Sequence, residues 1–517
     1  MAVKERKRAF TKRSKTGCRT CRARRVKCDE TPGACRNCTS AGWKCDGYDP
    51  VRLNPTVQKT EPKTPPSSLT LRRVPADLPG GNAEEKRGFA FFQNVTVPSI
   101  TGFFDSQLWT DLVLPMSHAE RAVNHAVIAL SALHEDLELR GVPISREELN
   151  NRHHRFALAQ YGRSLATLNE RRHSQDPKLR DIVLTCCLLF VTFELHRGQF
   201  DSAFMHLKQG LAIIEEARLS DDAHHSSPHL NAIEKSLSSA MTRLETSSFY
   251  FGFSQFAILP ESPRGDDGFK TVADARQSLD VLLARFTRFL KVCYEYPSKE
   301  RLPEYHPELA ERQHELNQEF RKYKNRLDWS EIHTVNAASK KEKRGLKLIR
   351  LHMVTFTLVC ETALVGDDFS VFADYLDEFH QMLTLSQQIS DSFLEGSRTG
   401  VRPGWLMDMG INPSLALICW KCHDWGLRER ALEIMDAWPH REGIWDSRLL
   451  AVCVRQIMQL EYDFMAISGA MSPHMTIQGE SLDVLADQNH AILKYQVAEP
   501  GLELHEQRRL VSFGEYA

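Results

Sequence analysis

The stretch GCRTCRARRVKCDETPGACRNCTSAGWKC, residues 17–45, holds six of the thirteen cysteines of a 517-residue chain. The intervals between these cysteines are two, six, six, two and six residues, so the second three repeat the first three at an offset of seventeen. The six are Cys18, Cys21, Cys28, Cys35, Cys38 and Cys45. Such regular spacing indicates either a disulfide framework or a metal site.

The redox state of the cellular compartment distinguishes a disulfide framework from a metal site. The basic start MAVKERKRAF is not followed by an apolar segment typical of a secretory signal, so we expect an intracellular protein. Cysteines in reducing compartments stay as thiols, and patterned cysteines there are more often metal ligands than disulfides. The stretch is therefore expected to bind metal.

Each half of the stretch supplies three sulfurs, whereas a structural zinc ion takes four ligands. Two zinc ions require eight zinc–sulfur bonds, and six sulfurs supply eight only if two of them bridge both ions. The internal repeat points to the equivalent first cysteines, Cys18 and Cys35, as the bridges. Because Val26 and Trp43 are almost its only large apolar side chains, metal binding must supply the folding energy of this segment.

Charge is distributed very unevenly along the chain. Residues 1–45 carry fourteen lysines and arginines against three acidic residues, while the net charge of the whole chain is −1. A basic N-terminal segment on a mildly acidic body is typical of a nucleic-acid-binding element joined to an unrelated domain.

Residues 46–88 are rich in proline, serine, threonine and charge, which predicts a linker. Beyond it, most segments up to about residue 466 have helical periodicity, as in the set Leu158, Tyr161, Leu165 and Leu168 and the set Phe204, Leu207, Leu211 and Ile214. We expect a loop around Asp221, few strands anywhere, and no clear pattern in the final fifty residues. The predicted fold class is all-α.

The most apolar run, residues 182–193, has twelve residues, fewer than the roughly 20 that cross a bilayer. We predict a buried core helix there and no membrane partner.

The cysteine intervals, with TCRARRVKCDE inside them, resemble the fungal Zn2Cys6 binuclear-cluster DNA-binding domain, and all six cysteines match. This resemblance implies two short helices, two zinc ions per chain and double-stranded DNA as partner. It also implies that basic residues of the first helix read a CGG triplet, with Arg24 and Arg25 at bases and Arg22 and Lys27 nearer phosphates. A phosphate contact alone is the simpler alternative for any one of these side chains. A zinc-binding fold that contacts protein instead of DNA is the alternative for the whole segment.

The runs KERKR and KRSK, within residues 4–15, resemble a nuclear localisation signal and would also extend the phosphate-binding surface. We find no heptads between residues 46 and 85, so we expect either a monomer that recognises one half-site or a dimer formed through the helical domain, and not a zipper dimer.

The body resembles the all-helical regulatory region of the same fungal transcription factors, in the branch that contains many metabolic and biosynthetic regulators. The matching segments are ALAQYGRSLATL at 157–168, LLFVTFELHRGQFDSAFMHLKQGLAII at 188–214 and HREGIWDS at 440–447. The expected organisation is a basic arm at 1–17, a DNA-binding domain at 18–45, a linker at 46–88 and a regulatory domain at 89–517.

Several motif-like segments are better interpreted as structural. CWKCH at 419–423 fits a haem-attachment pattern but reads as a buried helix, and Cys186 and Cys187 lie in the apolar run. The histidines at 224, 225 and 229 lie in a polar segment, HEDLE at 134 lacks the second histidine of a zinc protease, and GFSQF at 252 lacks the closing glycine of a nucleophile elbow. We therefore expect no enzyme.

These expectations describe a nuclear, sequence-specific regulator of RNA polymerase II transcription with structural zinc, acting with the transcription machinery or co-regulators on metabolic or biosynthetic genes. The alternatives are an enzyme or small-molecule sensor with an accessory zinc segment, and a zinc-dependent protein adaptor.

Overall fold

The computed structural model describes residues 17–24, 26–31, 33–46, 81–140, 151–222, 232–249, 268–295, 307–334, 339–365, 369–395, 401–468, 476–484, 490–498 and 505–512. The chain divides into two compact units, Met1–Arg73 and Val74–Ala517. They are described separately below.

The first unit contains two short helices, α1 (Arg19–Ala23) and α2 (Arg36–Thr39). Each helix follows the first cysteine of one half of the repeat, and Cys35 is the N-cap of α2 because its sulfur accepts the backbone N–H of Cys38. The buried centre of the described part of this unit consists of cysteine side chains, Cys18, Cys21, Cys28, Cys35 and Cys38, with Cys45 half-buried beside them.

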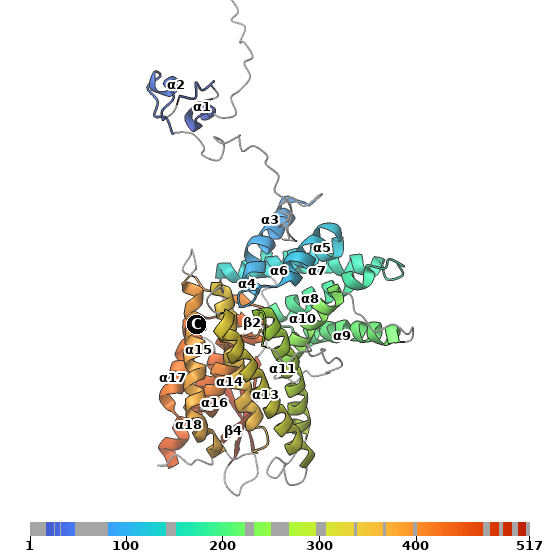
Figure 1. Ribbon diagram of the computed structural model, residues 1–517, viewed down its shortest axis with the longest axis vertical. Helices are drawn as coiled ribbons and strands as arrows, with labels where there is room; N and C mark the ends of the chain where they lie inside the picture. Colours follow the sequence, from blue (N-terminus) through green and yellow to red (C-terminus); the bar gives the residue numbers. More distant parts are fainter. Residues whose placement is uncertain are drawn as a thin grey trace, which may run out of the picture. The chain divides into compact units, whose positions relative to one another are not determined.

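The second unit begins with a group of helices that pack on one another, among them α3 on α6, α6 on α7 and α8, and α8 on α9 (Figure 1). Asn82 forms a capping box with Glu85, which explains why α3, the first helix of this unit that the structure describes, begins at Ala83. The helices are α3 (Ala83–Phe91), η2 (Phe92–Thr96), α4 (Val97–Ile100), η3 (Leu108–Val113), α5 (Leu114–Ala119), α6 (Arg121–Arg140), α7 (Arg152–Glu170), α8 (Leu179–His196), α9 (Phe200–Asp222) and α10 (Ala232–Ser248).

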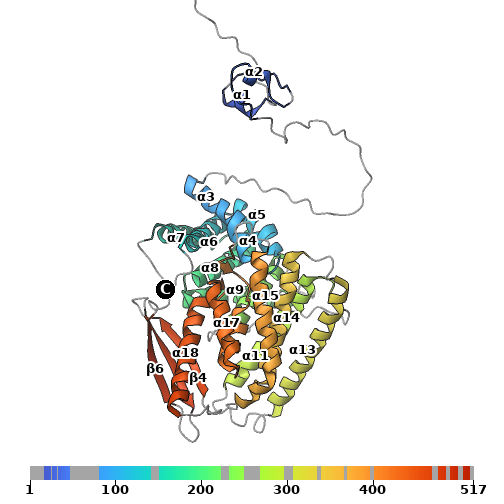
Figure 2. The same ribbon diagram turned by 90° about the vertical axis from the view of Figure 1, so that its left-hand side faces the viewer.

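The remaining long helices lie side by side in both views (Figures 1 and 2), each contacting its neighbour in sequence. Ser339 and Glu342 form a second capping box, at the start of α14. These helices are α11 (Val272–Glu295), α13 (Pro307–Thr334), α14 (Lys340–Glu361), η5 (Phe369–Tyr375), α15 (Leu376–Leu394), α16 (Asn412–Lys421), α17 (Trp425–Ala437) and α18 (Ser447–Ser468). One continuous apolar core links them to the earlier helices.

Two small sheets complete the described part of this unit. In the first, β1 (Trp405–Leu406) pairs in parallel with β2 (Arg441–Glu442), which pairs antiparallel with β3 (Trp445–Asp446). Gly443 has φ 58° and is the first of the two residues that join β2 to β3, a position where two-residue hairpins favour glycine. The hairpin therefore explains the glycine of HREGIWDS.

The second sheet is antiparallel, in the order β4 (Thr476–Val484), β5 (His490–Ala498) and β6 (His505–Ser512). Thr476 pairs with Ala498, and His490 pairs with Ser512. Its buried side chains Leu493 and Val511 belong to a small cluster with Val452 and Ile457 of α18. Figure 2 shows the sheet beside that helix.

The all-α prediction is confirmed for the body as a whole, and the apolar run forms the buried helix α8. The face predicted for α9 is also confirmed, because Leu207, Leu211 and Ile214 are buried there. In α7 the helix is correct but its face is rotated: Ala157, Gln160 and Ser164 are buried, and Leu165 is 38% exposed. The polar side chains of that face bond to the neighbouring helices and so can be buried.

One local prediction is wrong in part: the loop expected around Asp221 is helical as far as Asp222, where α9 ends, and the rest of that segment lies outside the described residues. The prediction of few strands is confirmed, because the described chain is mostly helical. The final fifty residues, which showed no clear pattern in the sequence, hold the β4–β6 sheet. Apolar residues stand next to one another in its strands, as in Ile492–Leu493 and Leu510–Val511, and do not alternate regularly with polar residues, so the strands do not stand out in the sequence.

Candidate metal centre and nucleic-acid interface

The six cysteine sulfurs of the first unit form two overlapping groups. Within each group of four, the sulfurs lie within 4.8 Å of one another. The first group is Cys18, Cys21, Cys28 and Cys35, and the second is Cys18, Cys35, Cys38 and Cys45. The groups share Cys18 and Cys35, whose sulfurs are 3.6 Å apart.

These distances suit tetrahedral zinc. Two sulfurs bound to one zinc at about 2.3 Å lie roughly 3.8 Å apart when the coordination is tetrahedral. The Sγ atoms of Cys21 and Cys35 are 3.5 Å apart, and those of Cys18 and Cys38 are 3.7 Å apart. Zinc is also a cation that favours four thiolate ligands, so both the donor type and the spacing fit.

Backbone N–H groups point at the sulfurs in a pattern that repeats in the two halves. Each such bond favours the thiolate, because an N–H donor stabilises negative charge on its acceptor. The backbone N–H of Cys21 donates to the sulfur of Cys18, and that of Cys38 donates to the sulfur of Cys35, both at 3.3 Å. The backbone N–H of Cys18 donates to the sulfur of Cys28, and that of Cys35 donates to the sulfur of Cys45, both at 3.4 Å.

Burial acts in the opposite direction. It raises the pKa of the Cys18 thiol to about 12 and also raises the pKa of the Cys21 and Cys35 thiols. Thiolates at these positions therefore require a compensating cation, which a pair of divalent metal ions would provide.

Side-chain hydrogen bonds connect the two halves of the cysteine repeat to each other, and these bonds also repeat. Asn37 Nδ2 donates to the carbonyl oxygen of Lys27 at 2.6 Å, and the hydroxyl of Thr20 donates to the carbonyl oxygen of Lys44 at 3.1 Å. Asn37 lies seventeen residues after Thr20, and Lys44 lies seventeen residues after Lys27. The repeat of the cysteines thus extends to the residues that join each helix to the other half.

Two aspartates occupy a third pair of repeated positions. Asp29 accepts the backbone N–H groups of Arg36 and Asn37, both at 3.1 Å, at the start of α2. Its hydrogen bond from Thr31, together with these N–H groups, holds the pKa of the Asp29 carboxyl well below its usual range. Asp46, seventeen residues later, accepts the Thr20 hydroxyl at 2.9 Å. Sequence reasoning missed these residues, although their offset was visible.

Arg24 is the predicted DNA-contacting residue whose side chain the structure describes in most detail. Its guanidinium lies over the Trp43 ring, 4.8 Å from the centroid, so the tryptophan of the second half holds an arginine of the first. Trp43 is 55% exposed. The Nη1 atom of Arg24 is buried and has no hydrogen-bond partner among the residues described.

The other predicted contacts are described in part. Lys27 is exposed, and Arg22 lies in α1 but its side chain is not described. Arg25 falls outside the described residues. The structure thus brings Arg24 and Lys27 to the part of the unit that follows α1, next to Val26, which is 45% exposed.

The structural interpretation of the remaining cysteines is confirmed. Cys419 and Cys422 are buried in the core at the end of α16, and Cys186 and Cys187 are buried in α8. Burial raises the pKa of the Cys419 thiol to about 12. His134 is buried and contacts Thr96 and Glu138, whereas the histidines at 224, 225 and 229 and the GFSQF segment lie outside the described residues.

Two family models match the sequence of this chain, one over the cysteine segment and one over much of the helical body. The model described as the fungal Zn(2)-Cys(6) binuclear cluster domain matches residues 16–54. The model described as the fungal specific transcription factor domain matches residues 88–365, more than half of the chain. The chain belongs to the fungal Zn2Cys6 transcription regulators.

Curated relatives agree with this assignment. The aspercryptin biosynthesis cluster-specific transcription regulator atnN of Emericella nidulans is 23% identical and covers 91% of each chain. The transcription regulator lscL of Purpureocillium lilacinum is 29% identical over 40% of this chain and 51% of its own. The Zn(2)-C6 fungal-type transcription factor afumD of Aspergillus fumigatus is 34% identical over 24% of this chain and 33% of its own. No solved structure matches the chain.

Membership establishes the general properties of this fungal Zn2Cys6 protein. It is a zinc-binding, DNA-binding regulator of transcription, and its family is one of regulators and not of enzymes. Within the part of the chain that the structure describes, no helix is both long and apolar enough to cross a membrane.

Proposed function

We propose that this protein is a nuclear, sequence-specific regulator of RNA polymerase II transcription that reads CGG-type triplets through the segment containing α1. The observation that carries the proposal is the pair of four-sulfur groups that share Cys18 and Cys35. One of these groups includes Cys21 of α1. The basic runs of the N-terminal arm, KERKR and KRSK, support nuclear import.

The proposed metal content is two zinc ions per chain. The ligands are Cys18, Cys21, Cys28, Cys35, Cys38 and Cys45, with Cys18 and Cys35 bridging both ions. The sulfur spacing and the repeated N–H donors support this assignment. When bound, the zinc ions supply the positive charge that keeps the six thiols deprotonated, and so they would fix α1 and the basic residues that follow it.

The proposed reading of DNA assigns different roles to neighbouring basic residues. The guanidinium groups of Arg24 and Arg25 meet the paired acceptors O6 and N7 of guanine in the major groove, and Arg22 and Lys27 contact phosphates. The stack of Arg24 on Trp43 supports this role, because it restricts the orientation of the guanidinium group. The first half also carries more basic residues than the second.

The proposed target is a metabolic or biosynthetic gene set. Support comes from atnN, which covers nearly the whole chain and is named as a regulator of one biosynthesis cluster. We also propose the organisation of arm (1–17), zinc domain (18–45), linker (46–88) and regulatory domain (89–517), with contacts to the transcription machinery or co-regulators and any homodimer made by the regulatory domain.

The test compares Arg25→Ala with Arg36→Ala in competition binding between a CGG-containing duplex and a scrambled one. Arg36 is exposed on α2, in the half that is not expected to read bases, so it is a matched control. We expect Arg25→Ala to lose about tenfold to a hundredfold of the preference, corresponding to about 1–3 kcal/mol, with unchanged zinc content. Equal loss in both variants, or none in Arg25→Ala, would contradict the proposed reading.

A further inference from the structure

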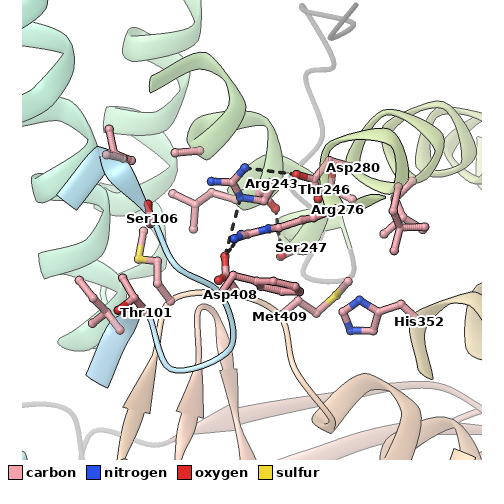
Figure 3. Close-up of a pocket in the computed structure, with 18 of the residues that line it drawn as sticks. Thr101, Ser106, Arg243, Thr246, Ser247, Arg276, Asp280, His352, Asp408 and Met409 are labelled. Carbon is pink, nitrogen blue, oxygen red and sulfur yellow. Dashed lines mark hydrogen bonds and ion pairs between the residues drawn. The ribbon is translucent and has the colours of Figure 1, made fainter. Parts of the chain in front are cut away.

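A cavity in the helical unit is lined by residues from five separate segments (Figure 3). It holds about 60 Å³ of space, whereas a single water needs only ~10–15 Å³ by the same measure. The lining comes from the segment between α4 and η3, from α10, α11 and α14, and from the turn after β1. Its size suits several waters or one small organic molecule.

Four charged side chains converge on this cavity. Arg243 Nη1 lies 3.2 Å from an oxygen of Asp280, and Arg243 Nε lies 3.7 Å from an oxygen of Asp408. Arg276 forms an ion pair with Asp408, and its guanidinium lies 4.2 Å from the centre of the Phe104 ring. Two positive and two negative side chains meet here, so the group has no net charge.

Placing these charges inside the domain is energetically costly. Burial raises the pKa of Asp280 and lowers the pKa of Arg276, which shows that the surroundings disfavour both charged forms. Replacing such ion pairs by apolar residues of similar volume is often neutral or stabilising, so the pairs are weak evidence for a stabilising role. The charged group is therefore better explained by recognition than by stability.

Some hydrogen-bonding atoms of the group are not used by the protein. Among the residues described, no partner contacts the second terminal nitrogen of Arg243 or the Oδ1 atom of Asp280. His352 Nε2 lies 3.0 Å from the carbonyl oxygen of Gly410 and so must be the donor there. Burial lowers the pKa of His352, so its Nδ1 is an acceptor. The cavity thus offers one cationic donor and two acceptors.

The turn that carries Asp408 is held rigidly. The buried carboxylate of Glu442 accepts the backbone N–H groups of Gly410, Ile411 and Asn412 at 3.1, 2.9 and 2.9 Å. A Cβ atom at Gly410 would collide with that carboxylate, so glycine is required for the close approach. The charged group is therefore organised before any ligand arrives, which favours binding.

We propose that this cavity binds a small zwitterion of the α-amino acid class with an apolar side chain. Its carboxylate would meet Arg243, its ammonium group would meet Asp280 and His352, and its side chain would lie against Trp109, Leu244 and Leu283 of the cavity wall. A ligand with a single negative charge would face both aspartates, and one with a single positive charge would face both arginines. The inference goes beyond the proposed reading of DNA and does not depend on it.

The first experiment uses the full-length, zinc-loaded protein and each proteinogenic L-amino acid in turn. We expect one or a few apolar amino acids to raise the melting temperature of the helical unit. Hydrogen exchange with such an amino acid should slow in residues 239–248 and 405–412 and stay unchanged in the β4–β6 sheet. The absence of any stabilising amino acid, or protection located elsewhere, would overturn the proposal.

The second experiment locates the site with a matched pair of variants. Arg243→Met removes the proposed carboxylate contact, and Arg285→Met breaks an ion pair of similar exposure with Glu319, at 2.7 Å, away from the cavity lining. We expect affinity to fall about tenfold to a hundredfold in Arg243→Met only. Equal affinity in the two variants would overturn the site. If Arg243→Met does not fold, Asp280→Asn removes the proposed ammonium contact and makes the same comparison.

Discussion

Five of the six cysteines in the first unit are buried, while Val26 and Trp43, the largest apolar side chains among its described residues, are 45% and 55% exposed. In the helical unit the relation is reversed, because one apolar core extends from Phe89 to Met458. The described part of the first unit has no apolar core that could hold it together without metal, whereas the second unit is held together by apolar packing. When metal ligands hold a fold together, their spacing in the sequence indicates the function. When apolar packing holds it together, the sequence indicates mainly where the helices lie.

Chelation of zinc is the strongest test of this difference. We expect it to unfold residues 17–46 and abolish DNA binding, since structural zinc contributes on the order of 10 kcal/mol or more to such segments. The melting temperature of the helical unit should not change. Calorimetry with and without chelator, alongside gel-shift binding, measures both. Loss of the helical transition on chelation would show that the two units do not differ in this way.

Glu442→Ala is the corresponding test of the helical unit. The substitution leaves three buried backbone N–H groups and His440 without their shared acceptor, so we expect a loss of about 3 kcal/mol or more in stability. Denaturant unfolding of the helical unit measures it, and the zinc content should remain unchanged. Glu429→Ala, at an exposed position of α17, is the control and should change stability by less than about 0.5 kcal/mol. A similar loss in both variants would contradict the role given to Glu442.

Asn37→Ala and Thr20→Val test whether the two halves of the zinc unit are equivalent. Asn37→Ala removes one hydrogen bond to the Lys27 carbonyl, worth about 0.5–1.5 kcal/mol, whereas Thr20→Val removes the hydroxyl that contacts the Lys44 carbonyl and the carboxylate and backbone N–H of Asp46. We expect both variants to release zinc to a chelator several times faster than the wild type, and Thr20→Val more so, because it loses more contacts. Wild-type release rates in both variants would show that the sulfurs alone determine the structure.

Trp43→Ala is expected to have the smallest effect. It removes the ring on which Arg24 lies, a contact worth about 0.5–1 kcal/mol at exposed sites. DNA affinity, measured by fluorescence anisotropy, should fall about twofold to fivefold at constant zinc content, and Trp43→Phe should restore most of it. A full restoration by Trp43→Leu instead would mean that the contact is only apolar.

The zinc unit was predictable in its ligand spacing and in its two short helices, because few chemistries require six cysteines at such intervals. The pairs Thr20 and Asn37, and Asp29 and Asp46, were not predicted. Their signal is the same offset of seventeen, which is weak for residues that occur in any polar loop.

In the helical unit, hydrophobic periodicity predicted the helices but not the polar and charged side chains that they bury. The buried face of α7 includes the polar side chains of Gln160, which is bonded to His125 at 2.6 Å, and Ser164, and hydrophobic spacing cannot indicate such a face. The charged group of the cavity joins Arg243 to Asp408, which are far apart in sequence. Only the packing of helices brings such residues together, and no local pattern records it.

The measurement that tests the central claim most directly is selection from random duplex DNA by the full-length protein, with and without a zinc chelator. The account predicts enrichment of a CGG-type triplet by the zinc-loaded protein and no enrichment once zinc is removed, while the helical unit stays folded. A motif that survives chelation, or a zinc-loaded protein that enriches no motif, would contradict it.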